Sequence, residues 1–265
     1  MITAGIDIGS CTTKVVVFNT ENQRIISKVI RLTGSQPKVV AEELLKKALI
    51  QAEVSRKEVE YIISTGYGRR AIGFSNKTIT EISCCAKGVS WYINQNQLTN
   101  LHTIIDLGGQ DTKIILLDEN NEIADFVMND KCAAGTGRFL EVMADVLGVD
   151  VDNLGNLSLK SKNPILINST CTVFAESEVI SLIAQGKNKE DIVAGICSSI
   201  AERTVSMVRQ VGGKGCIFFC GGGAKNEGIK KALEIKLGLK VYVPDEPQFV
   251  VAVGAALMAR SHYLP

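Results

Sequence analysis

The segment Ile6–Phe18, IDIGSCTTKVVVF, matches the segment Ile105–Leu117, IDLGGQDTKIILL, without a gap. Asp, Gly, Thr and Lys recur at the same positions of the two segments, and apolar residues fill both flanks. Each segment also opens a longer stretch of the same kind, in which a glycine turn separates two apolar runs. Self-similarity of this length indicates an internal repeat, so we predict that the chain folds as two related halves.

Each copy of the repeat has the pattern of a β-hairpin with a glycine turn. An apolar run ends in Asp and Gly, small polar residues follow, and a run rich in β-branched residues comes next. Backbone N–H groups of such a turn can converge on a phosphate, because no Cβ obstructs them. The neighbouring carboxylate, Asp7 or Asp106, can hold Mg²⁺ that bridges to phosphate, often through water. The pair of hairpins therefore predicts a phosphate clamp around one metal ion.

A third glycine cluster, Gly221–Asn226, follows a strand-like run and precedes the helix-like stretch Glu227–Leu237. A glycine turn in that setting lets the backbone approach a flat ring or a phosphate closely. Two competing phosphate motifs are excluded by their context. Gly213-Lys214 is followed by Gly215, which does not complete a Walker A loop, and the dinucleotide fingerprint needs a helix after its glycines where this repeat has a strand.

Composition narrows the class of protein. The 265 residues are 46% hydrophobic and 22% charged, which is typical of a globular chain. The 29 Lys and Arg against 28 Asp and Glu give a net charge of +1, without the basic surplus of a nucleic-acid-binding protein. The apolar run Phe249–Ala259 is shorter than the about 20 residues of a membrane span, and the start of the chain lacks a secretory signal pattern. We therefore expect a cytoplasmic protein that binds neither nucleic acid nor membranes.

Several longer motifs resemble one family within the actin-like ATPase superfamily, which includes sugar kinases, Hsp70 and actin. The two hairpins and Gly221–Ala224 are similar to the phosphate 1, phosphate 2 and adenosine motifs of that superfamily. The segments Asn129–Phe139, NDKCAAGTGRF, and Ser169–Glu178, STCTVFAESE, closely resemble the ATP-dependent activators of 2-hydroxyacyl-CoA dehydratases and the related ATPase subunits of benzoyl-CoA reductases. The likeness runs along the whole chain and includes Ser64–Arg69 and Pro244–Gln248.

The resemblance implies an α/β fold of two ribonuclease-H-like domains with a nucleotide cleft between them. We expect the first domain over residues 1–97, with the phosphate 1 hairpin. The second is expected over residues 98–265, with the phosphate 2 hairpin, the cysteine segment and the adenosine motif. The last helix, near residues 248–261, is expected to pack back on the first domain. In the first half we predict strands near 2–9, 13–19, 24–31 and 59–64, and helices near 37–54 and 80–94.

The same resemblance implies that ATP or ADP binds in the cleft, with Mg²⁺ near Asp7 and Asp106. Gln110 and Asp111 are the candidates for orienting the attacking water, and we favour Gln110 because a neutral amide does not repel the γ-phosphate. The predicted nucleotide contacts are Ser10, Cys11, Thr12, Thr13, Lys14, Gly108, Gly109, Gln110, Gly222, Gly223, Ala224 and Gln248.

Of the eight cysteines, none lies in a CxxC pair, and a free thiol is usually a small core residue. The resemblance nevertheless implies one [4Fe–4S] cluster shared across a homodimer, with Cys132 and Cys171 as its ligands in each chain. Two cysteines cannot complete four-thiolate ligation, so a two-fold axis must supply the second pair. Each of the two precedes a helix-like stretch, with Thr172 as the N-cap expected after Cys171, and a helix N-terminus favours the thiolate.

The function implied is an ATPase that couples ATP binding or hydrolysis to low-potential one-electron transfer. The acceptor would be an iron–sulfur enzyme, either a 2-hydroxyacyl-CoA dehydratase or a related reductase, and a ferredoxin or flavodoxin would resupply the electron. Two other classes stay open: a small-molecule kinase on the same fold, and a non-redox ATP-driven binding module of the Hsp70 or actin type. A kinase needs an acidic base beside a polar acceptor pocket, and it gains nothing from paired cysteines at helix starts.

Overall fold

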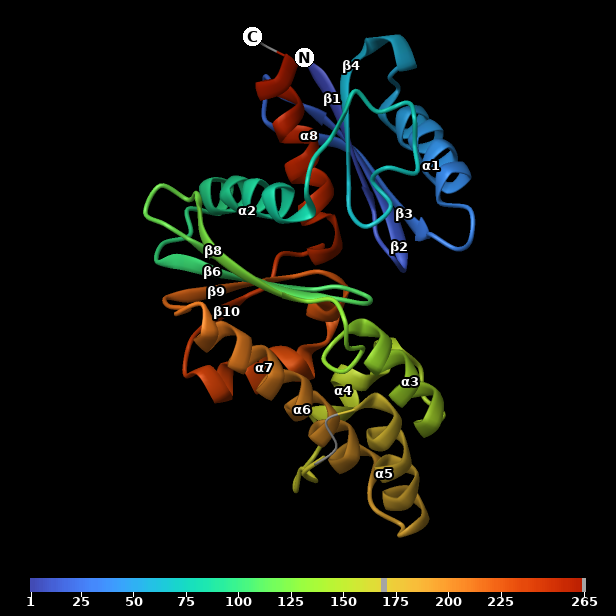
Figure 1. Cartoon of the computed structure of the whole chain (residues 1–265), viewed down its shortest axis with the longest axis vertical. Helices are drawn as coiled ribbons and strands as arrows, with labels where there is room; N and C mark the ends of the chain where they lie inside the picture. The colour runs from blue at the N-terminus through green and yellow to red at the C-terminus, as the bar shows by residue number, and fades with distance from the viewer. Residues whose placement is uncertain (168–170, 264–265) are drawn as a thin grey trace. The chain divides into compact units, whose positions relative to one another are not determined.

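The structure, a computed structural model, describes residues 1–167 and 171–263. The chain divides into two compact units (Figure 1). The first unit comprises Met1–Thr99, Asn121–Ile123 and Gln248–Pro265, and the second comprises Asn100–Asn120 and Ala124–Pro247. Ser169 and Thr170, which belong to one of the motifs that carry the family resemblance, lie outside the described residues.

Each unit is built on a mixed sheet, and each sheet has five strands among the residues that the structure describes. The strand order is β3-β2-β1-β4-β5 in the first sheet and β8-β7-β6-β9-β10 in the second. In both sheets the first two strands of the unit pair antiparallel, and the central strand pairs parallel with the fourth. The two sheets therefore correspond strand for strand, which confirms the predicted α/β fold of two related halves.

The strand bounds fall close to those expected from the sequence. In the first unit the strands are β1 (Ile2–Ile8), β2 (Thr12–Asn19), β3 (Arg24–Leu32), β4 (Val59–Thr65) and β5 (Lys77–Thr78). In the second unit they are β6 (Leu101–Leu107), β7 (Thr112–Leu117), β8 (Ile123–Asn129), β9 (Cys216–Cys220) and β10 (Val241–Tyr242).

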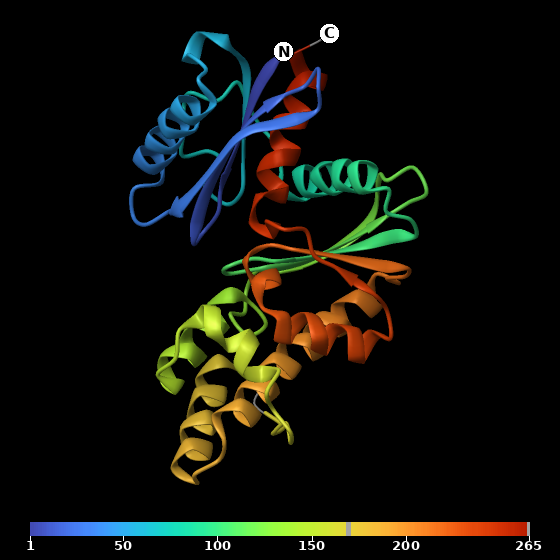
Figure 2. The same cartoon turned by 180° about the vertical axis from the view of Figure 1, so that it is seen from behind.

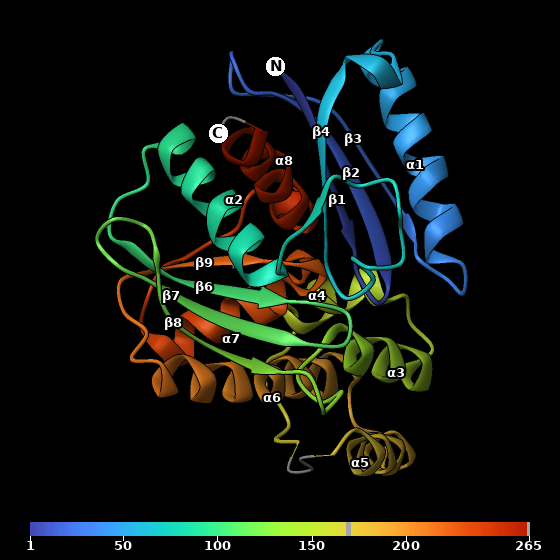
Figure 3. The same ribbon diagram turned by 45° about the horizontal axis from the view of Figure 1, so that its top comes forward.

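Three helices complete the first unit as far as it is described: α1 (Pro37–Ala52), α2 (Glu81–Asn96) and α8 (Val250–Tyr263). Proline at the start of α1 suits the first helical turn, where its missing N–H leaves no bond unmade. Figures 2 and 3 show α1 on one face of the first sheet and α8 on the other. Buried aliphatic residues of β1 and β2 fill the α1 side, whereas Val16 and Phe18 of β2 pack with α8 on the opposite side.

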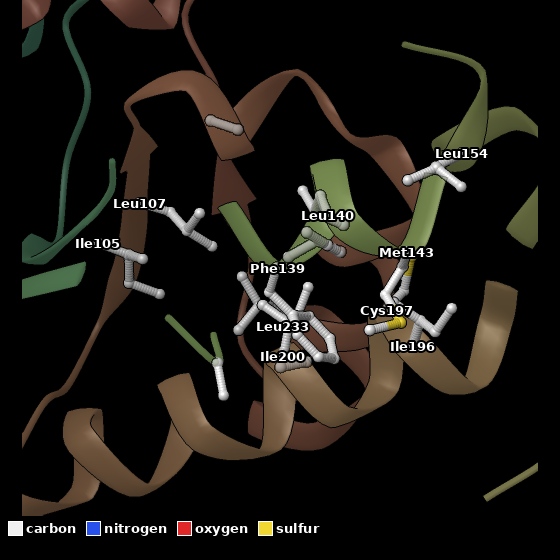
Figure 4. Close-up of a cluster of buried hydrophobic side chains, with 14 of the residues drawn as sticks. Ile105, Leu107, Phe139, Leu140, Met143, Leu154, Ile196, Cys197, Ile200 and Leu233 are labelled. Carbon is white, nitrogen blue, oxygen red and sulfur yellow. The ribbon is translucent and has the colours of Figure 1, made fainter. Parts of the chain in front are cut away.

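The described helices of the second unit are α3 (Gly137–Leu147), α4 (Leu154–Ser158), α5 (Thr172–Ala184), α6 (Lys189–Gln210) and α7 (Glu227–Leu237). Figure 4 shows the core that joins these helices to the second sheet. Ile105 and Leu107 of β6 contribute to it, as does Phe139 of α3, and all three are buried. In α3 the buried residues recur at helical spacing, which gives this helix one apolar face toward the core. Among the described residues, we find no helix with the length and apolar character that a membrane crossing requires.

Two glycines, which have no side chain, let α8 pack closely on both β1 and α2. Gly5 of β1 faces the α8 backbone, and a Cβ at that position would overlap the carbonyl oxygen of Ala252. Gly254 of α8 meets α2 in the same way, because its Cβ would overlap the carbonyl oxygen of Cys84. These contacts join the final segment of the chain to its first strand, so α8 belongs to the first unit.

Replacing Gly254 with Ala should destabilise the first unit by about 2 kcal/mol or more, since backbone atoms must move apart to admit the new methyl group. Urea unfolding followed by the fluorescence of Trp91, the single tryptophan of the chain, measures this effect, because Trp91 packs against Phe18 in the same unit. Gly73→Ala is the matched control, since nothing lies within 4 Å of its added Cβ. Equal midpoints for the two variants would contradict this account of the α2–α8 contact.

Candidate functional site

A buried carboxylate lies beside a lysine just before the first repeated turn. Asp7 lies within β1, is 6% exposed, and stands opposite Lys14 of β2. The Lys14 Nζ atom is 3.0 Å from Asp7 Oδ2, and the turn between the strands is closed by a hydrogen bond from the Gly9 N–H to the Thr12 carbonyl at 3.1 Å. The carboxylate was expected in the turn itself. The structure places it one residue before the strand ends, where the facing strand supplies its counter-ion.

The second turn repeats this geometry and adds a carboxylate. Asp106 of β6 stands opposite Lys113 of β7, with 3.6 Å between Nζ and Oδ2. The same ammonium lies 2.7 Å from Asp111 Oδ1, and the Lys113 side chain is only 3% exposed. The carboxylate of Asp111 is therefore engaged with Lys113, whereas Gln110 is exposed on the turn. Which of the two orients a water molecule stays a prediction.

Thr13, expected to contact the nucleotide, is fully buried. Its hydroxyl lies 2.9 Å from the hydroxyl of Thr33, which donates in turn to the carbonyl of Gly9 at 2.8 Å. Thr13 thus fixes the turn from inside the fold. Ser10, Cys11 and Thr12 are half-exposed on the same turn, and their contact with a nucleotide stays a prediction.

A glycine stands beside each of the two buried aspartates. Gly66 follows β4 with φ +86°, and a Cβ there would lie 2.5 Å from Asp7 Oδ1. Gly221 follows β9 with φ +83°, and its Cβ would lie 2.5 Å from Asp106 Oδ1. Both positions require glycine, because the backbone is left-handed and passes directly against the carboxylate.

The two glycines show that the repeat extends beyond the hairpins. Gly66-Tyr67-Gly68 in the first unit corresponds to Gly221-Gly222-Gly223 in the second, since each segment follows the fourth strand of its sheet. Sequence reasoning assigned only the second of these to nucleotide binding and left Gly66 without a role. The recurrence of Gly-x-Gly after an apolar strand is the signal that could have identified it.

The predicted adenosine segment forms a short 3-10 helix, Gly222–Lys225, between β9 and α7. Gly222 is exposed, whereas Gly223 and Ala224 are buried. Gln248, the remaining predicted contact of this group, belongs to the first unit. The contacts of these four residues with a nucleotide stay predictions.

Cys132 and Cys171 are each half-exposed in the second unit; Cys132 lies five residues before the first residue of α3, and Cys171 directly precedes α5. Cys132 precedes α3, and Cys171 is itself the N-cap of α5, so the expected N-cap at Thr172 was wrong by one residue. The helices α3 and α5 are in contact and lie side by side in Figure 1. Within the described residues, no group of three or more His, Cys, Asp or Glu side chains is placed to hold a metal ion.

The remaining cysteines differ in exposure. Cys84, Cys85, Cys197 and Cys220 are buried, and burial raises the pKa of the thiols of Cys84 and Cys197 to about 12. These two thiols are therefore protonated core groups, and Figure 4 shows Cys197 among the apolar side chains. Cys216 was expected in the core with Cys220, but it is half-exposed at the start of β9.

The segment Ser161–Ile165, which precedes Cys171 in the chain, is bonded to α6 through the backbone carbonyl and the carboxylate of Asp191. Asp191 Oδ1 accepts hydrogen bonds from the Ser161 hydroxyl at 2.7 Å, from the Lys162 N–H at 3.1 Å and from the Asn163 N–H at 3.0 Å. These bonds favour the ionised form and lower the pKa of the Asp191 carboxyl below its usual value. Sequence reasoning gave Asp191 no role, because its partners lie far from it along the chain.

Lys113→Met should lower the free energy of unfolding by about 3 to 5 kcal/mol, because it leaves the buried carboxylate of Asp106 without its counter-ion. Lys236→Met is the control, since its pair with Glu202 is exposed, with side chains 27% and 65% accessible, and should cost at most about 1 kcal/mol. Chemical unfolding at neutral pH measures both values. Similar losses in the two variants would show that burial does not set the strength of the Lys113 pair.

The chain is similar in sequence and in fold to known ATPases and activators. A family model described as the BadF/BadG/BcrA/BcrD ATPase family matches residues 4–259. The solved structure of the activator of the 2-hydroxyisocaproyl-CoA dehydratase from Clostridium difficile, with bound ADPNP, is 42% identical, with a TM-score of 0.92 over 99% of this chain and 96% of that chain. The structure of component A of the (R)-2-hydroxyglutaryl-CoA dehydratase of Acidaminococcus fermentans is 39% identical, with a TM-score of 0.94 over 100% of both chains.

A more distant solved structure shares the fold alone. It is a glucokinase of the ROK family from Streptomyces griseus in complex with glucose and AMPPNP, 14% identical, with a TM-score of 0.59 over 98% of this chain and 100% of that chain. Together these neighbours confirm the predicted actin-like ATPase fold.

Proposed function

We propose, because the chain belongs to the BadF/BadG/BcrA/BcrD ATPase family, that it is an ATP-hydrolysing activator of an iron–sulfur partner enzyme. The proposed partner is a 2-hydroxyacyl-CoA dehydratase or a related reductase. Two relatives, at 42% and 39% identity, are named as the activator and as component A of such dehydratases. The observation that carries the proposal is the presence, in one chain, of two matched carboxylate–lysine pairs beside glycine turns and of two half-exposed thiols that precede the contacting helices α3 and α5.

In this proposal the two turns bind the phosphates of ATP. Backbone N–H groups of the turns around Ser10 and Gly109 would hold phosphate oxygens, and Lys14 would add positive charge beside them. Asp7 and Asp106 would hold Mg²⁺, often through water, because hard cations prefer oxygen ligands. The donor chemistry fits this ion, since both groups are carboxylates and each lies one residue before the end of its strand, next to the proposed phosphate turn. Hydrolysis of ATP by water yields ADP and phosphate.

Cys132 and Cys171 are the proposed ligands of a [4Fe–4S] cluster, which when bound accepts and releases one electron. Both thiols are half-exposed, unlike the buried thiols of Cys84 and Cys197, and α3 contacts α5. Thiolates are the ligands that such clusters use, so the residues present fit the group. Each chain provides two of the four thiolates required, and a second copy of the chain would provide the other two across a two-fold axis.

The apolar surface of α5 supports burial of this region in an assembly. Val173 and Phe174, two and three residues after Cys171, are 65% and 67% exposed, and Ile180 on the same helix is 51% exposed. Large apolar side chains gathered on one surface usually mark an interaction site. A ferredoxin or flavodoxin would supply one electron to the protein, and the partner enzyme would receive it, so the electron count balances.

Cys132→Ala should abolish iron binding while leaving the affinity for ADP unchanged, since it removes one ligand and touches neither turn. Anaerobic purification with iron and sulfide analysis should give about four irons per dimer for the unmodified protein. Cys216→Ala is the matched control, because Cys216 is also half-exposed and lies in the same unit. Full iron content in Cys132→Ala, or a colourless monomeric parent protein, would refute the cluster assignment.

Gln110→Ala should lower kcat for ATP hydrolysis by about 100-fold with little change in the Kd for ADP, because a misplaced water molecule reacts slowly. Asp111→Asn keeps an oxygen acceptor for Lys113 and should change kcat by about threefold or less, well short of the loss from a misplaced reactant. Steady-state hydrolysis and calorimetric ADP binding separate the two effects. The reverse ranking would identify Asp111 as the residue that orients the water.

A further inference from the structure

The second phosphate turn is hydrogen-bonded directly to the start of α3. The carbonyl oxygens of Gly108 and Gly109 accept bonds from the N–H groups of Gly137 and Arg138, at 2.9 and 2.8 Å. Gly137 and Arg138 are the first two residues of α3, whose N–H groups have no acceptor within the helix itself. The phosphate turn therefore acts as the N-terminal cap of α3.

A third bond joins the same two segments. The hydroxyl of Thr112, which is 1% exposed, donates to the carbonyl of Gly135 at 2.7 Å. Thr112 is the first residue of β7, directly after the turn, and Gly135 lies between Cys132 and α3. The turn and the cysteine segment are thus joined by three hydrogen bonds, all within the second unit.

The cysteine segment has little internal freedom to absorb a movement of the turn. The Asn129 side chain donates to the Cys132 carbonyl at 3.2 Å. The N–H and the hydroxyl of Thr136 both donate to the carbonyl of Ala133, at 3.0 and 2.6 Å. A shift at Gly135 or at the start of α3 is therefore passed on toward Cys132.

The planar peptide bond gives the turn two functional sides. The carbonyl of Gly108 and the N–H of Gly109 belong to one trans peptide and point in opposite directions, and the same holds for the next peptide to Gln110. The carbonyl side binds α3. The N–H side is the one proposed to hold phosphate, so rotation of either peptide plane on phosphate binding must also move a bond to α3.

The first unit uses the equivalent groups differently. Its turn carbonyl, on Gly9, accepts from the Thr33 hydroxyl, and the Thr13 hydroxyl, equivalent to that of Thr112, also bonds to Thr33. Thr33 directly follows β3, as the Cys132 segment follows β8. In the first copy, the Thr33 side chain therefore makes the hydrogen bonds to the turn that the cysteine segment and α3 make in the second copy.

We propose that the hydrogen bonds joining Gly108, Gly109 and Thr112 to the Cys132–α3 segment transmit the nucleotide state of the second turn to the cluster thiolate. This rests on the proposed function and specifies how its two sites are coupled. Thr112 is a positioning residue in this scheme. A nucleotide can shift the cysteine segment only by as much as it binds one arrangement of the turn better than another, and the three bonds supply that difference.

The test uses the anaerobically purified holoprotein with ADP or ADPNP. The rate at which bathophenanthroline removes iron is measured with each nucleotide, and the ratio of the two rates reports the coupling. We expect a ratio of about fivefold or more in the unmodified protein, typical of coupled sites. Thr112→Val should keep its iron and its ADP affinity but bring the ratio close to one. Thr204→Val, which removes an equally buried hydroxyl bonded to the carbonyl of Ile200 in α6, should keep the full ratio.

A second pair of variants tests the backbone bond. Arg138→Pro removes the N–H that reaches the Gly109 carbonyl, at a position in the first helical turn where proline is tolerated. Arg138→Ala keeps that N–H and removes the side chain, including its exposed ion pair with Glu141. The ratio should fall in Arg138→Pro and stay in Arg138→Ala.

The outcomes separate this inference from the proposed function. A parent protein without iron, or with a ratio of one, overturns the proposed function itself. A parent ratio that survives unchanged in both Thr112→Val and Arg138→Pro overturns only the transmission route. Loss of iron in Thr112→Val with a retained ratio in Arg138→Pro also counts against transmission, because Thr112 would then only hold the cysteine segment in place.

Discussion

The candidate site depends on keeping a carboxylate charged where water hardly reaches it. Asp7 and Asp106 are almost fully buried, and each has a lysine directly across the strand pair. A buried carboxylate without a counter-ion is unstable, so the lysine is needed for the site to exist before any ligand arrives. Gly66 and Gly221 pass against the carboxylate oxygens, where any side chain would overlap them. Both copies of the repeat therefore contain the same three features: a buried aspartate, a lysine that pairs with it, and a glycine whose lack of a side chain lets the backbone pass against the carboxylate.

Most of the fold could be predicted from the sequence because the deciding signals are local. The hairpins, their glycine turns and the run from β1 to α1 follow from apolar alternation and from residues such as Pro37 that mark a helix start. The two copies then constrain each other, since a topology inferred for one must also suit the second. The two half-exposed cysteines that precede α3 and α5 were identified by resemblance alone, because eight thiols offer no spacing that separates Cys132 and Cys171 from the rest.

Contacts between distant segments were not predictable in the same way. The backbone of Gly66 lies against the carboxylate of Asp7, and the Asp191 carboxylate accepts three hydrogen bonds from residues 161–163. Neither Gly66 nor Asp191 lies in a local sequence pattern that indicates its partner. The half-exposure of Cys216 has a similar cause. Its strand parity matches that of Cys220, but it lies at the first residue of β9, where the strand leaves the core. Strand parity gives the face on which a side chain lies, and the end of the strand sets its burial.

The two turns have the same geometry, but their carbonyl groups are bonded to different parts of the chain, so a movement of each turn would have different consequences. In the first unit the turn carbonyl is satisfied by the Thr33 side chain, and a movement of that peptide plane ends at one hydroxyl. In the second unit the equivalent carbonyl caps α3, and the same movement acts on a helix whose buried face, including Phe139, packs into the core. A rigid packed helix transmits a displacement that a single rotatable hydroxyl absorbs. Under the proposed function, phosphate could bind equivalently at the two turns while only the second turn is connected to a proposed cluster ligand, Cys132.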